Sequence, residues 1–179
     1  MKTITIPGQE LYDPVTGLFS TTKDATITIE HSLVSLSKWE SKWKKPLLAT
    51  KDMTRPMFED YVRCMTVTQN VDPLVYKCLT VSQINEIQEY MADPMTATVI
   101  KSDKKTGGKN RFMTSELIYA YMAILRIPYE CQKWHLNRLL TLIQVVSIEQ
   151  EPKKKMSKAD TMSRHRSLNA ARRAKHPHL

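Results

Sequence analysis

The fold class is decided by one stretch of the chain, Leu136-Asn137-Arg138-Leu139-Leu140-Thr141-Leu142-Ile143-Gln144-Val145-Val146-Ser147-Ile148. On a helix, its apolar side chains would wrap almost all the way round, which is typical of a central, buried helix. Asn137, Arg138, Gln144 and Ser147 break the run, and it is shorter than the roughly 18 apolar residues of a membrane-spanning helix. We therefore expect a soluble protein whose core is built around this helix.

Apolar residues recur at intervals of three and four over most of the chain beyond residue 31, which is the spacing of amphipathic helices. Capping residues or Pro stand at the start of several of these segments, and the pair Thr80 and Gln83 fits a capping box. Pro46 and Pro94 end two of them. We predict helices over the ranges 33–46, 54–65, 73–78, 80–92, 114–125, 128–148 and 157–174.

The first thirty residues follow a different pattern. Residues 3–6 and 25–29 alternate β-branched side chains with a period of two, and Pro14 and Gly17 lie between them at turn spacing. These features predict a small N-terminal β-meander. The run 96–100 also has the composition of a strand.

Together, these patterns predict a mainly α (α+β) fold in a single domain, since 179 residues suffice for one core and are few for two. The β-meander (1–30) belongs to the same domain as a helical core (31–151), which carries a basic hairpin or loop at 101–111. A basic C-terminal helical tail occupies 152–179.

The net charge of +9 is concentrated in this tail. Such asymmetry suggests that the tail meets an acidic surface, phosphate or a membrane surface, although a solvated tail that keeps the protein soluble is the alternative. The tail contains one acid, Asp160, and nine cations: Lys153, Lys154, Lys155, Lys158, Arg164, Arg166, Arg172, Arg173 and Lys175.

No motif for catalysis, metal binding or cofactor binding stands out. Three isolated cysteines and a start without a signal-peptide pattern predict free thiols in a reducing cytoplasm. Cys131 and His135 could share a helix face, but two residues supply neither a zinc site nor a nucleophile with an oriented base. Gly107-Gly108-Lys109 lacks the first glycine and the following Ser or Thr of a phosphate-binding loop. We expect no enzyme and no cofactor.

Aromatic residues and methionines leave two interpretations open. Trp39 and Trp43 stand among lysines, as in proteins that stack on single-stranded bases, but they share a stripe with Leu36 and Leu47, which favours core packing. The ten methionines suit either an adaptable groove for partner segments or gaps in the core.

Long motifs in this chain resemble a family of small proteins encoded in the structural-gene region of tailed bacteriophages. The strongest match is residues 127–143 (IPYECQKWHLNRLLTLI), followed by residues 31–43 (HSLVSLSKWESKW). Shorter matching segments are 93–98, 114–119, 154–157 and 168–173. The resemblance thus extends over most of the chain, from about residue 27 to residue 175.

The resemblance implies a role in tail assembly, as a chaperone that binds the tape-measure protein or the tail tube protein in the host bacterial cytoplasm. It implies no catalytic residues. Trp134, His135, Asn137 and Arg138 are candidate partner-binding residues together with Trp39 and Trp43, and a hydrogen-bond network in the core is the alternative for the polar ones.

Two other functions remain open at this point. One is a structural component of the virion whose tail rests on DNA or on an acidic subunit face. The other is a nucleic-acid-binding regulator. In both, phosphate or acidic groups would be contacted by Lys153, Lys154, Lys155, Arg164, Arg166, Arg172 and Arg173.

Overall fold

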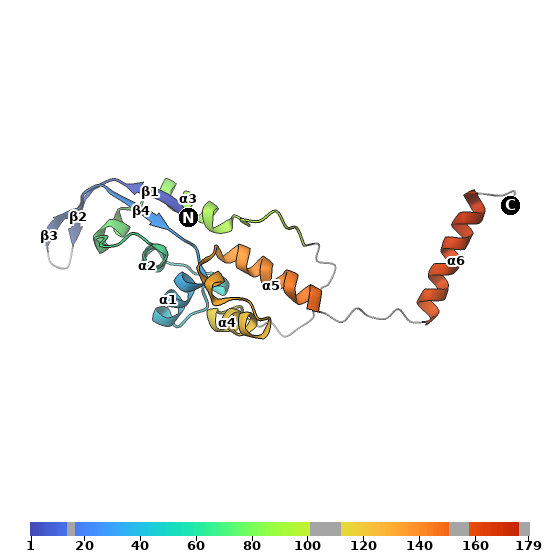
Figure 1. Cartoon of the computed structure of the whole chain (residues 1–179). Helices are drawn as coiled ribbons and strands as arrows, with labels where there is room; N and C mark the ends of the chain where they lie inside the picture. Colours follow the sequence, from blue (N-terminus) through green and yellow to red (C-terminus); the bar gives the residue numbers. More distant parts are fainter. Residues whose placement is uncertain (14–16, 101–111, 151–157, 176–179) are drawn as a thin grey trace. The chain divides into compact units, whose positions relative to one another are not determined.

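The computed structural model describes residues 1–13, 17–100, 112–150 and 158–175 (Figure 1). This part of the chain is mainly helical with short antiparallel strands at the N-terminus, so the predicted mainly α (α+β) class is confirmed. It divides into two compact units, residues 1–147, here called the body, and residues 148–179. None of the described helices is long and apolar enough to cross a membrane.

The N-terminal strands form a nested hairpin, and the predicted meander is wrong. Strand β1 (Lys2–Ile6) pairs with β4 (Ala25–Ile29), while β2 (Glu10–Asp13) pairs with β3 (Leu18–Thr21). The β1–β4 register places Ile4 opposite Ile27, so the isoleucines of both strands are buried on one face and the threonines point outward. A meander would have given β1 a neighbour without matching isoleucines.

Helix α1 (Leu33–Trp43) begins at a capping box in which the side chains of Ser32 and Ser35 each accept the other's backbone N–H. It ends at Lys44, which has a positive φ of 54°, so the helix stops before Pro46. The short 3-10 helix η1 (Leu47–Ala49) follows.

The next three helical segments lie where the sequence predicts them. They are α2 (Arg55–Met65), the 3-10 helix η2 (Pro73–Cys78) and α3 (Val81–Ala92). The predicted capping box of Thr80 and Gln83 is present, and Asp72 caps η2. The run 96–100, expected as a strand, is irregular because its polar side chains bond locally, as in the 3.1 Å bond from Thr98 N to Thr96 Oγ1.

The helix predicted over 128–148 is two elements, a 3-10 helix η3 (Tyr129–Lys133) and α5 (Leu136–Gln150). The break arises because the backbone here pairs with the end of the β4 region. His135 bridges Ser32, and Leu136 N donates to His31 O at 2.7 Å. Nor is α5 buried all round: Leu136, Leu139 and Ile143 are buried, but Ile148 is exposed.

Helix α4 (Ser115–Ile124) precedes η3, and α6 (Lys158–Lys175) is the last helix. The predicted basic loop at 101–111 and the lysines Lys153, Lys154 and Lys155 lie outside the described residues, as does the expected cap Ser157.

The core of the body is built from β1, β4 and one face of each helix before α6. Met57, Met65 and Met122 are buried in it, so these methionines fill the core and do not line a groove.

Candidate functional site

His135 lies in a buried polar centre where β4, α2, α3 and α5 meet. Its Nε2 is 3.1 Å from Tyr90 O, and its ring packs edge-on against those of His31 and Tyr90. Tyr61 Oη lies 2.7 Å from His31 Nδ1, and Tyr90 donates to Glu30 Oε1 at 2.8 Å. The arrangement matches the core hydrogen-bond network that was the alternative to partner binding.

Both histidines of this centre are held neutral. Burial, with a smaller effect of the nearby His135, lowers the pKa of His31 from 6.5 to about 3. Burial also lowers the pKa of His135, although the hydrogen bond to the Tyr90 carbonyl acts in the opposite direction and raises it. Since a carbonyl only accepts, His135 Nε2 carries the proton, and Nδ1 has no hydrogen-bond partner in the described structure. Both imidazoles are therefore uncharged at neutral pH.

Trp134, Asn137 and Arg138, the candidate partner-binding residues next to His135, lie at or near the start of α5. Asn137 donates to Met91 O at 2.9 Å and to Asp93 O at 2.8 Å, so it satisfies carbonyls at the C-terminal end of α3. The Arg138 guanidinium lies 4.2 Å from the ring centre of Trp134. Arg138 is exposed, and Trp134 and Asn137 are half-buried, so only His135 among these four residues is withdrawn from the surface.

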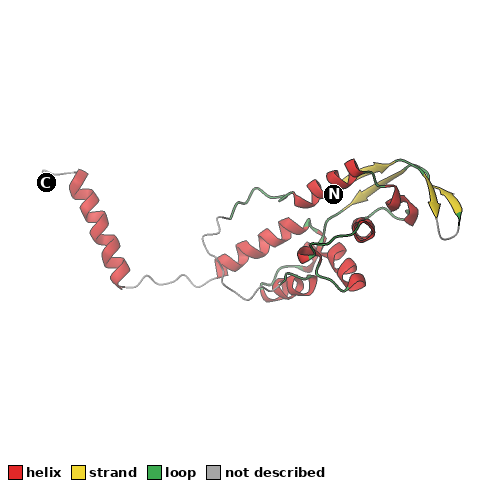
Figure 2. Cartoon of the chain, turned by 180° about the vertical axis from the view of Figure 1, so that it is seen from behind, coloured by secondary structure: helices red, strands yellow, loops and turns green. Residues whose placement is uncertain are grey.

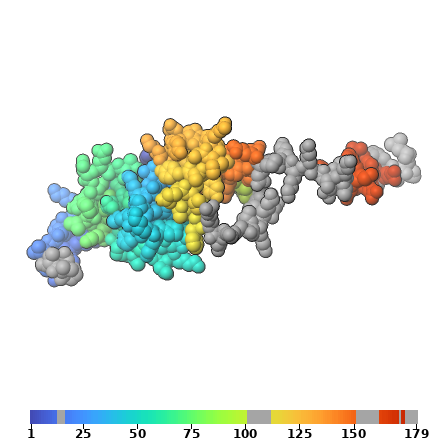
Figure 3. Space-filling model, turned by 90° about the horizontal axis from the view of Figure 1, so that it is seen from below, coloured from blue at the N-terminus to red at the C-terminus, as the bar shows by residue number. Residues whose placement is uncertain are grey.

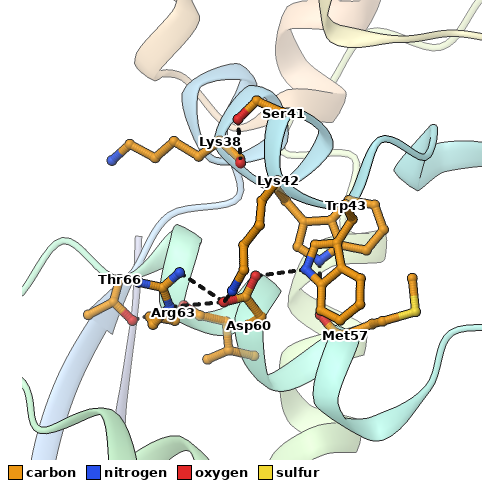
Figure 4. A network of polar contacts seen from close by, with 10 residues as sticks. Lys38, Ser41, Lys42, Trp43, Met57, Asp60, Arg63 and Thr66 are labelled. Atoms are coloured by element: carbon orange, nitrogen blue, oxygen red, sulfur yellow. Dashed lines mark hydrogen bonds and ion pairs between the residues drawn. The ribbon is translucent and has the colours of Figure 1, made fainter.

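Trp39 and Trp43 separate into core and surface. Trp39 is fully buried and donates through Nε1 to Met57 O at 2.9 Å, which confirms core packing. Trp43 is half-buried and donates to Asp60 Oδ2 at 2.8 Å. Figure 4 shows Asp60 as the hub of this network, contacted also by Lys42 and Arg63.

The electrostatics of this hub are those of a structural carboxylate. Burial alone would raise the pKa of Asp60, but the hydrogen bonds from Lys42, Trp43 and Arg63 hold it below its usual value. Oδ1 contacts Lys42 and Arg63, and Oδ2 accepts from Trp43. The Trp43 ring itself stacks on that of Trp39, with the ring centres 6.0 Å apart, and Lys42 Nζ lies 5.7 Å from its centre.

Glu40 is a buried residue that the sequence patterns did not single out. Its Oε1 accepts from Leu47 N at 3.0 Å and its Oε2 accepts from Ser115 N at 2.7 Å. The carboxylate therefore satisfies the first N–H of α4 and fixes that helix against α1. Two core side chains of α4, Ile118 and Met122, are fully buried and hold the rest of the helix in place.

The side of α4 that adjoins its buried face is apolar and partly exposed. Leu117 is half-buried, Tyr121 is 38% exposed and Ile124 is 72% exposed. These residues follow intervals of four and three, the spacing at which one helix packs along another. Figure 3 shows α4, in yellow, as an uncovered surface of the body. We call Leu117, Tyr121 and Ile124 the α4 outer face.

A second apolar surface lies on the hairpin of β2 and β3, which extends beyond the helices at one end of the body in both ribbon views (Figure 1 and Figure 2). Leu18 and Phe19 are each 66% exposed, and the rings of Tyr12 and Phe19 are 5.0 Å apart. Consecutive apolar residues in a strand, as in Leu18-Phe19, were the signal for it, because neighbours point to opposite faces.

The four arginines predicted to contact phosphate or acidic groups lie on α6, where Arg164, Arg166, Arg172 and Arg173 are all exposed. They belong to the second unit, whereas Trp134, His135, Asn137, Arg138, Trp39 and Trp43 belong to the body. Each group is therefore described within its own unit.

Among the residues that the structure describes, no cluster of His, Cys, Asp and Glu could hold a metal ion. No family model, curated protein or solved structure matches the chain. The α4 outer face and the β2–β3 hairpin both present apolar side chains to the solvent.

Proposed function

We propose that this chain is a tail-assembly protein of a tailed bacteriophage, and that it binds a helical segment of another phage protein along the α4 outer face. The tape-measure protein is the proposed partner, with the tail tube protein as the next candidate. Binding would take place in the host bacterial cytoplasm during assembly. The proposal draws its biological setting from the resemblance of residues 31–43 and 127–143 to proteins of phage structural-gene regions.

The observation that carries the binding mode is the exposed apolar spacing of Leu117, Tyr121 and Ile124. A helix in water normally turns polar residues outward, so an apolar stripe on the outer side of α4 favours burial against a partner. Intervals of four and three suit a partner that is itself a helix. A long helical protein awaiting assembly exposes such segments, which an assembly chaperone would cover.

The α4 outer face is also rigid before binding. Glu40 holds the N-terminus of α4, while Ile118 and Met122 lock its inner side into the core. A partner would therefore meet a pre-organised surface and pay little entropy for ordering it. Tyr121 adds an aromatic ring of the type enriched at the centres of protein interfaces.

Co-expression with the tape-measure protein from the same phage, followed by affinity purification, tests the proposal. We expect a complex that Tyr121→Gln/Ile124→Gln weakens by about 30-fold, since losing about 1 kcal/mol of apolar burial at each position totals about 2 kcal/mol. Val81→Gln is the matched control, because Val81 is 70% exposed on α3 and Ile124 is 72% exposed.

Failure to form any complex would reject the proposed function. A complex that resists the double variant would reject the α4 outer face as its surface. Mass spectrometry of purified virions separates an assembly chaperone from a structural virion component. The chaperone would be missing from the particles, whereas the structural component would be present in them.

A further inference from the structure

The C-terminal helix α6 presents a second interaction chemistry, unrelated to the α4 outer face. Residues 162–173 contain four arginines and one histidine and no Asp or Glu. Every described side chain between residues 162 and 170 is exposed, and so are Arg172 and Arg173. This segment therefore presents concentrated positive charge to the solvent.

The described side chains of α6 do not form the apolar face with which a helix enters a protein groove. Its large exposed apolar residues are Met162 and Leu168. At about 100° per residue, six residues place them about 120° apart around the helix axis, so they cannot share one stripe. This contrasts with the α4 outer face, and it leaves charge as the means by which α6 attracts a partner.

The four arginines form two rows on different sides of the helix. Arg164 and Arg172 are about 80° apart around the axis, whereas Arg166 and Arg173 are only about 20° apart. The centres of the two rows are about 150° apart on the same construction. Within each row the arginines are separated by about 10 to 12 Å along the axis.

Short side chains lie between the rows. Ser163, Ser167 and Ala170 cluster within about 60° of one another, and Ser167 Oγ bonds back to Arg164 O at 2.9 Å. A helix with a narrow side between two cationic rows can lie deep in a channel and contact both of its walls. A flat acidic protein face would reach only one row.

We infer that α6 binds duplex DNA, with its short-side-chain face toward the floor of the major groove and its arginine rows on the phosphates of the two strands. The major groove of B-form DNA is about 12 Å wide and admits an α-helix. Guanidinium groups pair with phosphate through two parallel hydrogen bonds, which makes arginine suited to this contact. The binding is to phosphate and is indifferent to sequence.

Fluorescence anisotropy of the full-length chain with a labelled 20-base-pair DNA duplex tests the inference. We expect the slope of log affinity against log salt to flatten by about 3 to 4 when all four arginines become glutamine, at about 0.9 per lost phosphate contact. The duplex affinity should fall at least tenfold at low salt. The Arg→Lys version of the same four changes should keep most of the slope.

The matched control removes four exposed cations from the body, Lys23, Lys44, Lys45 and Lys51, by Lys→Gln changes. It should reduce the affinity far less than the α6 variant, and equal losses would overturn the inference. The two row variants, Arg164→Gln/Arg172→Gln and Arg166→Gln/Arg173→Gln, should weaken binding to a similar degree. An effect confined to one row would overturn the groove geometry.

Competitor ligands complete the test. Single-stranded DNA and A-form duplex RNA should bind more weakly than duplex DNA, because neither offers a wide major groove. Tighter binding of a poly-glutamate peptide than of duplex DNA at the same salt would show that α6 recognises acidic protein, and the inference would be wrong.

Discussion

Replacing Glu40 tests how the α4 outer face is supported. The Glu40 side chain is buried, and its two carboxylate oxygens accept from Leu47 N and Ser115 N. Glutamine has nearly the same shape but presents an NH2 group in place of one oxygen. In Glu40→Gln, either Leu47 N or Ser115 N must then face a donor, and the buried charge-assisted bond is lost.

The magnitude follows from the number of bonds affected. A hydrogen bond to a charged group contributes about 1.5–3 kcal/mol, and a buried donor without an acceptor costs a similar amount. We expect Glu40→Gln to lower the free energy of unfolding by about 2–3 kcal/mol and Glu40→Ala, which loses both bonds, by about 3–5 kcal/mol. The former corresponds to a fall in melting temperature of about 5–10 °C.

Thermal unfolding and amide hydrogen exchange measure these effects. Glu59→Gln is the matched control, because Glu59 pairs with the half-exposed Arg55 on the surface of α2 and should contribute less than about 0.5 kcal/mol. Exchange of the Ser115 amide should accelerate in Glu40→Gln and stay unchanged in the control. Equal melting temperatures for the two variants, with unchanged exchange at Ser115, would refute the reasoning.

Three further predictions concern the body. Because the pKa of His31 falls from 6.5 to about 3 on folding, the unfolded chain binds a proton that the folded chain does not; stability is therefore complete above pH 6.5 and decreases as the pH falls toward 3. The urea midpoint at pH 7.5 and pH 4.5 should differ more for the native chain than for His31→Gln, and equal differences would contradict this assignment. Asn137→Ala should cost about 1–2 kcal/mol in urea unfolding, because it leaves carbonyls at the end of α3 without their donor, while Asn169→Ala on the exposed α6 should have no effect on the body. Gly8→Ala should lower the melting temperature more than Gly17→Ala, because a Cβ at Gly8 would lie 2.3 Å from Thr22 O, whereas Gly17 has open space and only a φ of 70° to strain; the reverse order would show that the nested hairpin is wrongly registered.

Local signals in the sequence predicted the elements that depend on neighbouring residues. The predicted capping box at Thr80 and the proline in the first turn of α2 involve side chains within a few positions of the helix start. Helix positions before residue 93 were therefore predictable to within a few residues, apart from the early end of α1. Trp39 was also placed correctly in the core by its spacing.

Contacts between distant segments caused the errors. The break between η3 and α5 depends on the bond from Leu136 N to His31 O, which joins residues 105 positions apart. The nested hairpin depends on pairing of β1 with β4, and no local pattern distinguishes it from a meander. Glu40 was missed for the same reason, since its acceptor role is set by Ser115 on another helix.

The α4 outer face is visible in the sequence only in part. Residues 115–124 (SELIYAYMAI) are apolar at most positions, a pattern that a fully buried helix and a helix awaiting a partner share. Exposure in the folded chain separates the two, because Tyr121 and Ile124 point away from the core that contains Ile118 and Met122.

Site-specific photo-crosslinking tests the central claim most directly. A photoreactive phenylalanine analogue replaces Tyr121 in cells that co-express the tape-measure protein, and the cross-linked peptides are identified by mass spectrometry. We predict a cross-link from position 121 to a helical segment of the tape-measure protein and none from position 81, although Val81 is 70% exposed and Tyr121 only 38%. Cross-links from position 81 but not 121, or cross-links from 121 only to other copies of this chain, would contradict it.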